Sequence, residues 1–206
     1  MHFTIFKTPV IRTIFRGIAL ALLKITGWKK EGRFPRNQNC VIIAAPHTSN
    51  WDFFYGFMLV LAAGVDTYWM GKASLFKFPF GGIMKYLGGI PVERSRTNNI
   101  VSQAVDSFNK DPRLAITIPP EGSRSAAEYW KSGFYFIALK AGVPILLGYI
   151  DYARKRAGFG PLFYPTGDID TDMEKIRHFY KNIRGRYPEN ETEPRISSRH
   201  YKKEVS

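Results

Sequence analysis

The chain has 206 residues, of which 45% are hydrophobic, a length and composition that suit one ordinary globular domain with a substantial core. Its formal net charge is +13 and 15% of its residues are aromatic. Cys40 is the only cysteine, so an intrachain disulfide is excluded, and its place beside an apolar run predicts a buried thiol.

The positive charge is concentrated near the N-terminus, where residues 1–50 contain eight Lys or Arg and one Glu. Such a surplus attracts polyanions, either nucleic acid or an anionic membrane surface. Between Phe3 and Trp28 basic residues are interleaved with large apolar ones, and the longest uncharged run, Gly17 to Leu23, is too short to span a bilayer. We therefore expect residues 1–30 to form an amphipathic helical segment in contact with a membrane. The alternative is a helix packed on the protein's own core.

The N-terminal segment also indicates in which cellular compartment the protein lies. The apolar stretch runs into Lys24 and Lys29-Lys30 without a convincing small-residue cleavage site, so a signal peptide is not expected. The single cysteine agrees with a reducing compartment. We expect a cytoplasmic protein, held peripherally at the inner face of the cell membrane.

A strand, a loop and a helix are predicted around His47. The apolar run Val41 to Pro46 is short and closed by proline, which is typical of a buried strand. The run Phe53 to Val65 is long enough for a helix, and Ser49 is placed to cap it. A histidine in such a loop can accept a proton near neutral pH, and the carboxylate of Asp52 can hold its other ring nitrogen.

Other interpretations of these residues remain open. Ser49-x-x-Asp52 is also a capping box, in which Asp52 would accept hydrogen bonds from backbone amides and take no part in catalysis. His47 could be an ordinary loop histidine or half of a metal site. However, His2, His178 and His200 show no metal-ligand spacing around His47, so no metal is expected.

Further apolar runs alternate between strand and helix patterns. Strands are predicted at residues 67–72, 90–94, 114–118 and 143–150, and helices at 98–110, 134–141 and 172–184. This alternation predicts a three-layer α/β fold with a mostly parallel sheet flanked by helices. Residues 31–187 would form the folded domain, with a polar link at 29–39, and residues 188–206 a loose C-terminal tail.

The loops after the predicted strands contain most of the reactive side chains. Parallel strands end at one edge of a sheet, so these loops should meet there. The candidates for the site are His47, Asp52, Lys72, Arg94, Glu121, Gly122, Ser123 and Arg124. Cations beside a base and a glycine-bearing loop suit a substrate with a phosphate and a hydroxyl to be deprotonated. For any single cation, a solvated surface charge is the alternative.

Four stretches in this order resemble the motifs of the glycerolipid acyltransferases, a group that includes bacterial 1-acyl-glycerol-3-phosphate acyltransferases. They are His47-x-x-x-x-Asp52, Gly89 to Arg94, Pro120 to Arg124, and Val143-Pro144-Ile145. The third departs from the usual pattern, since Ser123 replaces threonine, and the fourth lacks its second proline.

The resemblance implies a membrane-surface enzyme of phospholipid biosynthesis that transfers an acyl group directly, without a metal or cofactor. His47 would be the general base and Asp52 its orienting partner. Arg94, Glu121, Gly122, Ser123 and Arg124 would bind the acceptor, with Lys72 added on charge alone. The donor would be acyl-CoA or acyl carrier protein, and the acceptor a lysophospholipid, with 1-acyl-glycerol-3-phosphate as the commonest choice and a lyso-aminolipid as an alternative.

Two further expectations concern apolar residues and partners. Phe53 to Val65 and the aromatic residues Phe76, Phe78 and Phe80 are candidates for lining an acyl-chain tunnel, with core packing as the alternative. Partners would be the two substrates and an anionic membrane surface. A basic nucleic-acid-binding module is the competing class, but no nucleic-acid-binding signature occurs in the sequence, so no nucleic acid is expected.

Overall fold

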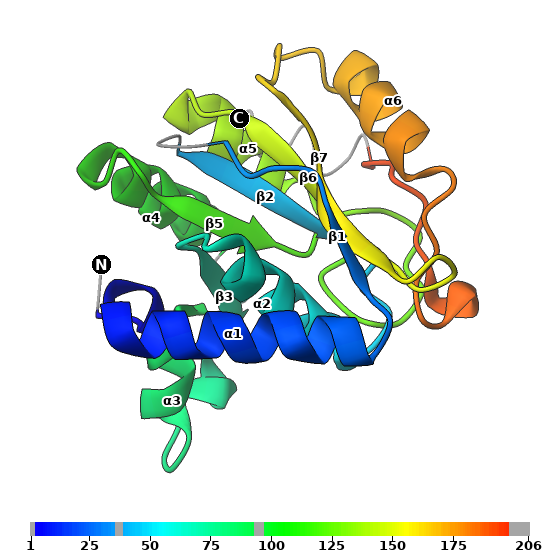
Figure 1. The fold of residues 1–206 in the computed structure, drawn as a ribbon. Helices are drawn as coiled ribbons and strands as arrows, with labels where there is room; N and C mark the ends of the chain where they lie inside the picture. Colours follow the sequence, from blue (N-terminus) through cyan, green and yellow to red (C-terminus); the bar gives the residue numbers. More distant parts are fainter. Residues whose placement is uncertain (1–2, 36–38, 93–96, 198–206) are drawn as a thin grey trace.

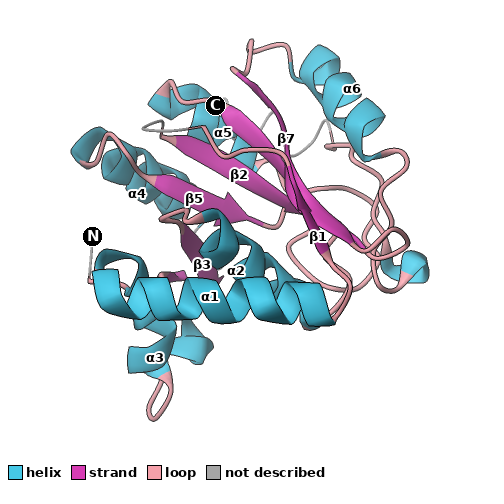
Figure 2. Ribbon diagram, viewed as in Figure 1, coloured by secondary structure: helices cyan, strands magenta, loops and turns pink. Residues whose placement is uncertain are grey.

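A computed structural model describes residues 3–35, 39–92 and 97–197. Its centre is a seven-stranded sheet with the strand order β1-β7-β6-β2-β5-β3-β4 (Figure 1). Strands β2, β3, β4, β5 and β6 run parallel, while β7 pairs antiparallel with β6 and parallel with β1. Helices cover both faces of the sheet (Figure 2), so the predicted three-layer α/β fold with a mostly parallel sheet is confirmed.

Most elements lie where the apolar patterns predicted them. The strands are β1 (Lys29–Glu31), β2 (Cys40–Ala45), β3 (Tyr68–Lys72), β4 (Gly89–Val92), β5 (Ala115–Ile118), β6 (Ile145–Asp151) and β7 (Arg156–Phe163). The helices are α1 (Pro9–Ile25), α2 (Trp51–Ala63), α3 (Gly81–Tyr86), α4 (Thr97–Lys110), α5 (Gly133–Ala141) and α6 (Ile169–Tyr180). Short 3₁₀ turns are η1 (Ile5–Lys7), η2 (Ala73–Phe76) and η3 (Pro188–Asn190).

Strand β2 lies at the centre of the sheet, and its side chains are divided between two cores. Val41, Ile43 and Ala45 pack with residues of α4, α5 and α6, whereas Cys40 and Ile42 pack with α1 and α2. A strand that is covered on both faces needs a continuous apolar sequence, which is why Cys40–Ala45 contains no polar side chain. Cys40 is fully buried, as expected, and burial raises the pKa of its thiol to about 12.

The N-terminal helix α1 crosses the outside of α2 (Figure 1). Ala19 and Leu23 are buried in the core that α1 shares with α2. The predicted N-terminal helix is therefore confirmed, and it does pack on the domain. Seven large apolar side chains of α1 nevertheless remain exposed: Val10, Ile11, Ile14, Phe15, Ile18, Leu20 and Ile25. Within the described ranges, no helix has both the length and the apolar composition needed to cross a bilayer.

The first correction concerns β1 and β7. The link at residues 29–39 was predicted to be irregular, but Lys29–Glu31 forms an edge strand, and the glycine-bearing stretch after residue 152 contains β7. Close packing explains the glycine: a Cβ atom on Gly158 would lie 2.3 Å from the carbonyl oxygen of Glu31. Glycine at this position therefore permits strand pairing, whereas from sequence it resembled a loop signal.

Two apolar segments expected to line a tunnel have other surroundings. The middle of α2, from Met58 to Ala62, is buried in the core. Phe76 packs against Trp69 with a ring-centroid distance of 5.8 Å, but Phe78 and Phe80 are 97% and 62% exposed. The structure thus gives α2 a packing role and leaves Phe78 and Phe80 on the surface.

The described part of the C-terminal stretch is attached to the domain. The backbone amide of Trp130 donates a hydrogen bond of 2.8 Å to the carbonyl of Arg195, and Ile196 forms a β-bridge with Trp130. The indole Nε1 of Trp130 donates to the carbonyl of Thr192 at 3.1 Å. The sequence predicted a loose tail from residue 188, and these contacts attach its described part to the domain at Thr192, Arg195 and Ile196.

Candidate active site

His47 lies in the short loop between the carboxyl end of β2 and the start of α2. Its side chain is 17% exposed, while the neighbouring Thr48 and Ser49 are buried. Helix α2 begins with Asn50 as its N-cap, one residue after the predicted cap Ser49. The Ser49 hydroxyl still accepts a hydrogen bond of 3.2 Å from the amide of Trp51. The strand and the helix therefore fix the backbone on both sides of His47.

The structure brings His47 and Asp52 together. Nδ1 of His47 lies 3.3 Å from Oδ2 of Asp52, and the carboxylate is almost completely buried. When Nδ1 carries the proton that this contact favours, Nε2 keeps its lone pair. A neutral imidazole held in this way can remove a proton from a hydroxyl group.

Asp52 also caps the loop, as the capping-box interpretation predicts, and the same carboxylate contacts His47. Its Oδ2 accepts hydrogen bonds from the amides of Thr48 at 2.6 Å and Ser49 at 2.7 Å, and Oδ1 accepts one from the Ser49 hydroxyl at 2.9 Å. Burial raises the pKa of Asp52, but the hydrogen bonds from His47, Tyr152 and Ser49 outweigh burial, and the net pKa is lowered. Asp52 is therefore an anion at neutral pH.

Tyr152 is a member of the site that the sequence did not reveal. Its hydroxyl donates a hydrogen bond of 2.7 Å to Oδ1 of Asp52. The ring packs edge-on against Trp28 and Tyr55, at centroid distances of 5.0 and 5.9 Å. Tyr152 directly follows β6, which is parallel to β2 and adjacent to it. Parallel strands end at one edge of a sheet, and this rule placed the other loops of the site. Applied to the strand that ends at residue 151, the same rule would also have placed Tyr152 there.

Glu121 lies beneath the His47 loop. Its Oε1 accepts a hydrogen bond of 3.0 Å from the backbone amide of His47, and its side chain is only 3% exposed. Its other oxygen, Oε2, is buried without a hydrogen-bond partner among the described residues. Burial raises the pKa of Glu121 to about 8, and the nearby Asp52 and Glu191 add to this effect. From sequence we predict that Glu121 binds the acceptor, and the contact seen in the structure is with the backbone amide of His47.

The rest of the glycine-bearing loop is on the surface. Gly122 has a φ of 71°, a conformation that favours glycine, and its amide donates to the carbonyl of Pro119 at 3.3 Å. The Ser123 hydroxyl donates to the carbonyl of Ser125 at 3.1 Å. Arg124 is exposed, as is Lys72 at the end of β3. Arg94 lies outside the described residues.

A C-terminal segment, residues 184–191, closes over the His47 loop. The amide of Tyr187 donates a hydrogen bond of 3.2 Å to the Thr48 hydroxyl, and Oε1 of Glu191 accepts one of 2.7 Å from the amide of Gly185. The guanidinium of Arg186 lies 5.3 Å from the ring centroid of Trp51, in a cation–π contact. Arg186 thus adds a positive charge near the site. No local pattern in the sequence indicated Arg186, because it follows the last regular helical pattern.

The arrangement places an imidazole against a buried carboxylate, with Tyr152 and Glu121 holding the two groups in position. It suits the deprotonation of a hydroxyl group that then attacks an acyl carbon. Within the described ranges, no group of three or more His, Cys, Asp or Glu side chains is placed to hold a metal ion.

Comparison with known proteins gives two matches. The sequence model of the family described as Acyltransferase matches residues 28–147, which is more than half of the chain. Among solved structures, the fold is similar to that in the crystal structure of the 1-acyl-sn-glycerophosphate (LPA) acyltransferase PlsC from Thermotoga maritima. That match has a TM-score of 0.55 and 19% sequence identity, and covers 83% of this chain and 75% of the other. No curated protein matches the chain.

Proposed function

Because the chain belongs to the acyltransferase family, we propose that it transfers a fatty acyl group from a thioester donor to the free hydroxyl of a lysophospholipid at a membrane surface. The donor would be acyl-CoA or acyl carrier protein. The acceptor that we propose first is 1-acyl-glycerol-3-phosphate, which would give phosphatidate. Membership of an enzyme family also weighs against the nucleic-acid-binding alternative.

The observation that carries this proposal is the contact between His47 Nδ1 and Asp52 Oδ2, at 3.3 Å. In the proposed reaction, Nε2 of His47 takes the proton from the acceptor hydroxyl while the hydroxyl oxygen attacks the thioester carbonyl carbon. A carbon–oxygen bond forms, the carbon–sulfur bond breaks, and the imidazolium returns its proton to the leaving thiolate. No acyl-enzyme, metal or cofactor takes part in this scheme.

The surrounding groups have supporting roles. Asp52 stabilises the imidazolium and fixes the tautomer, and Tyr152 fixes Asp52. Glu121 holds the backbone of His47 through its amide. We assign the phosphate of the acceptor to Arg94 and Arg124, whose planar guanidinium groups can each donate two hydrogen bonds. Lys72 would add a point charge, and Gly122 and Ser123 would shape the loop beside them.

Helix α1 supplies the membrane contact in this proposal. Val10, Ile14, Ile18 and Ile25 are 71%, 56%, 46% and 81% exposed, and their spacing places them on one stripe of the helix. A helix with such a stripe and basic flanks binds the interface of an anionic bilayer. The protein would then be peripheral, on the cytoplasmic face of the cell membrane.

A thiol-release assay tests the proposal. Purified wild-type protein in detergent would be given acyl-CoA and a panel of lysolipids that includes lysophosphatidate, a lyso-aminolipid and neutral lysolipids, and the product mass would be recorded. The proposal expects thiol and a diacyl product with a phosphorylated acceptor. Repeating the assay with acyl carrier protein as the donor distinguishes an unsuitable donor from an inactive protein. Silence with both donors and every acceptor would contradict the proposed reaction.

A further inference from the structure

The loop between η2 and α3 carries two exposed aromatic side chains. Phe78 is 97% exposed and Phe80 is 62% exposed, on either side of Pro79. We call residues 77–80 the aromatic tip. The preceding Phe76 is by contrast packed against Trp69. Protein surfaces often expose single apolar residues, but two largely exposed phenylalanines at the end of one projecting loop need an explanation.

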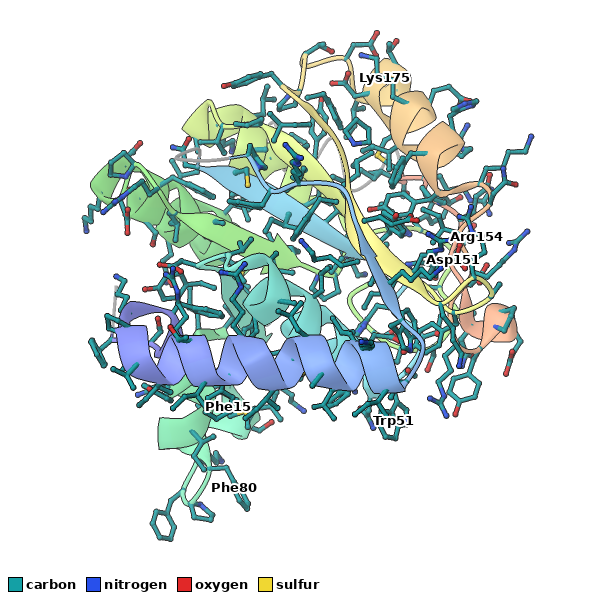
Figure 3. The ribbon with its side chains drawn as sticks, in the orientation of Figure 1. Phe15, Trp51, Phe80, Asp151, Arg154 and Lys175 are labelled. Carbon is teal, nitrogen blue, oxygen red and sulfur yellow. The ribbon has the colours of Figure 1, made fainter. Side chains whose placement is uncertain are left out.

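The aromatic tip projects on the same side of the molecule as the exposed Phe15 of α1 (Figure 3). In Figure 3 the side chains of Phe15, Trp51 and Phe80 all point from the lower side, from α1, α2 and the aromatic tip. The segments that carry these three residues, or adjoin them, contain further exposed apolar side chains: Ile14, Ile18, Ile25, Leu75, Phe78 and Ile83. Three separate elements therefore present apolar side chains to one side.

The charge of these elements indicates what covers that surface. Residues 1–30 contain six Lys or Arg and no Asp or Glu, and residues 67–92 contain three Lys and no Asp or Glu. Lys77 lies within the aromatic tip itself and is exposed. Arg12 pairs with Asp66 at 3.4 Å, but the basic residues of these segments still outnumber the acidic ones, and an apolar surface with a net positive border fits anionic headgroups above an acyl layer. A second copy of the chain would bring the same positive charge, so it fits poorly.

We propose that the aromatic tip inserts into an anionic bilayer as a second anchor beside α1, and that the two anchors together orient the His47 loop toward the membrane. This proposal deepens the proposed function and rests on it for the lipid substrate. Trp51, four residues after His47, is 48% exposed on the same side. Docked in this way, the protein places the His47 loop at the level of the headgroups, where a lysolipid carries its free hydroxyl.

Vesicle binding of a double variant tests the second anchor. Phe78→Ser/Phe80→Ser would be compared with wild type by sedimentation with vesicles containing about a third phosphatidylglycerol. We expect the apparent affinity to fall by roughly 10- to 100-fold, because two aromatic rings no longer leave water. Both side chains are exposed in the free protein, so the melting temperature should not change. Equal vesicle binding by the variant and the wild type would overturn the proposal.

A matched control is available on the other side of the sheet. Tyr164 is 58% exposed and follows β7, in a segment drawn far from α1 and α3 (Figure 1). Tyr164→Ser removes an exposed aromatic ring of similar size and should leave vesicle binding unchanged. A loss equal to that of the double variant would mean that general surface hydrophobicity governs binding, and would refute the aromatic tip as an anchor.

The depth of insertion can be measured directly. Cys40 is the only native cysteine and is fully buried, so a spin label will react selectively with Phe80→Cys. On vesicles we expect this label to become accessible to oxygen and protected from a water-soluble relaxation agent. A label that stays accessible to the water-soluble agent on bound protein would contradict insertion.

The same samples separate this proposal from the proposed function. If the label inserts but thiol release fails with every lysolipid and both donors, the anchor stands and the assigned reaction fails. If thiol release in detergent is intact and the label stays in water, the reaction stands and the anchor fails. The double variant itself should keep wild-type turnover in detergent micelles, since it changes none of the groups around His47.

Discussion

The buried carboxyl group of Glu121 should make the stability of the protein depend on pH. The side chain is buried, its Oε1 holds the amide of His47, and its Oε2 has no partner among the described residues. Glu121→Gln keeps a carbonyl oxygen to accept from His47 and removes the ionisable group. The substitution therefore tests the raised pKa with little change in shape.

The sign of the effect follows from proton linkage. The pKa of Glu121 is about 8 in the folded protein, against an ordinary value of 4.5. Between these values the folded protein holds a proton that the unfolded chain releases, so the wild type loses stability as pH rises. Each pH unit within this window lowers the free energy of unfolding of the wild type by at most about 1.4 kcal/mol. Asp52, whose pKa is lowered, is ionised in both states above about pH 5 and adds no slope there.

Urea unfolding at several pH values between about 5.5 and 7.5 measures this effect. The difference in unfolding free energy, Glu121→Gln minus wild type, should increase by about 1 kcal/mol for each pH unit. The difference between their melting temperatures should then increase by about 2–4 °C for each pH unit. Glu189→Gln, at an exposed position on η3, should follow the wild type at every pH. If the two glutamine variants and the wild type gave parallel pH profiles, the buried, protonated state of Glu121 would be refuted.

Two further predictions concern Tyr152 and the proposed phosphate site. Tyr152→Phe removes the 2.7 Å hydrogen bond to Asp52. We therefore expect kcat to fall by about tenfold and the free energy of unfolding by about 1.5–3 kcal/mol, with KM for the acceptor unchanged. An unchanged kcat in steady-state assays would show that Tyr152 does not position the catalytic pair. Arg94→Ala and Arg124→Ala should each raise KM for a phosphorylated acceptor by about tenfold and leave KM for the acyl donor unchanged. An unchanged KM for the acceptor in both arginine variants would contradict the proposed phosphate site.

The central part of the fold could be predicted because its signals are local. Strand β2 and helix α2 are apolar runs whose lengths differ, and the loop between them is fixed by both. The rule that parallel strands end at one edge then placed the His47 and Glu121 loops together. Strand β7 could not be predicted in the same way, because Gly158 is needed for contact with β1, which is distant in sequence.

The site was only partly predictable for a related reason. The spacing of His47 and Asp52 lies within one loop and one helical turn, so the pair could be proposed from sequence. Tyr152 reaches Asp52 from 100 residues away, so only the rule that parallel strands end at one edge, applied to β6, could have placed it near the site. The surface position of Phe78 could not be deduced either, because an aromatic residue beside glycine and proline suits a buried wall as well as a projecting loop.

The most direct test of the central claim is the turnover of His47→Ala with the best lysolipid and acyl donor. General-base catalysis contributes about 10²- to 10⁴-fold, so we expect kcat to fall by at least about a hundredfold. The variant should keep a normal melting temperature and normal acceptor binding, because the hydrogen bonds of Asp52 to Thr48, Ser49 and Tyr152 remain. A well-folded His47→Ala protein that retained more than about a tenth of the wild-type kcat would contradict His47 as the base.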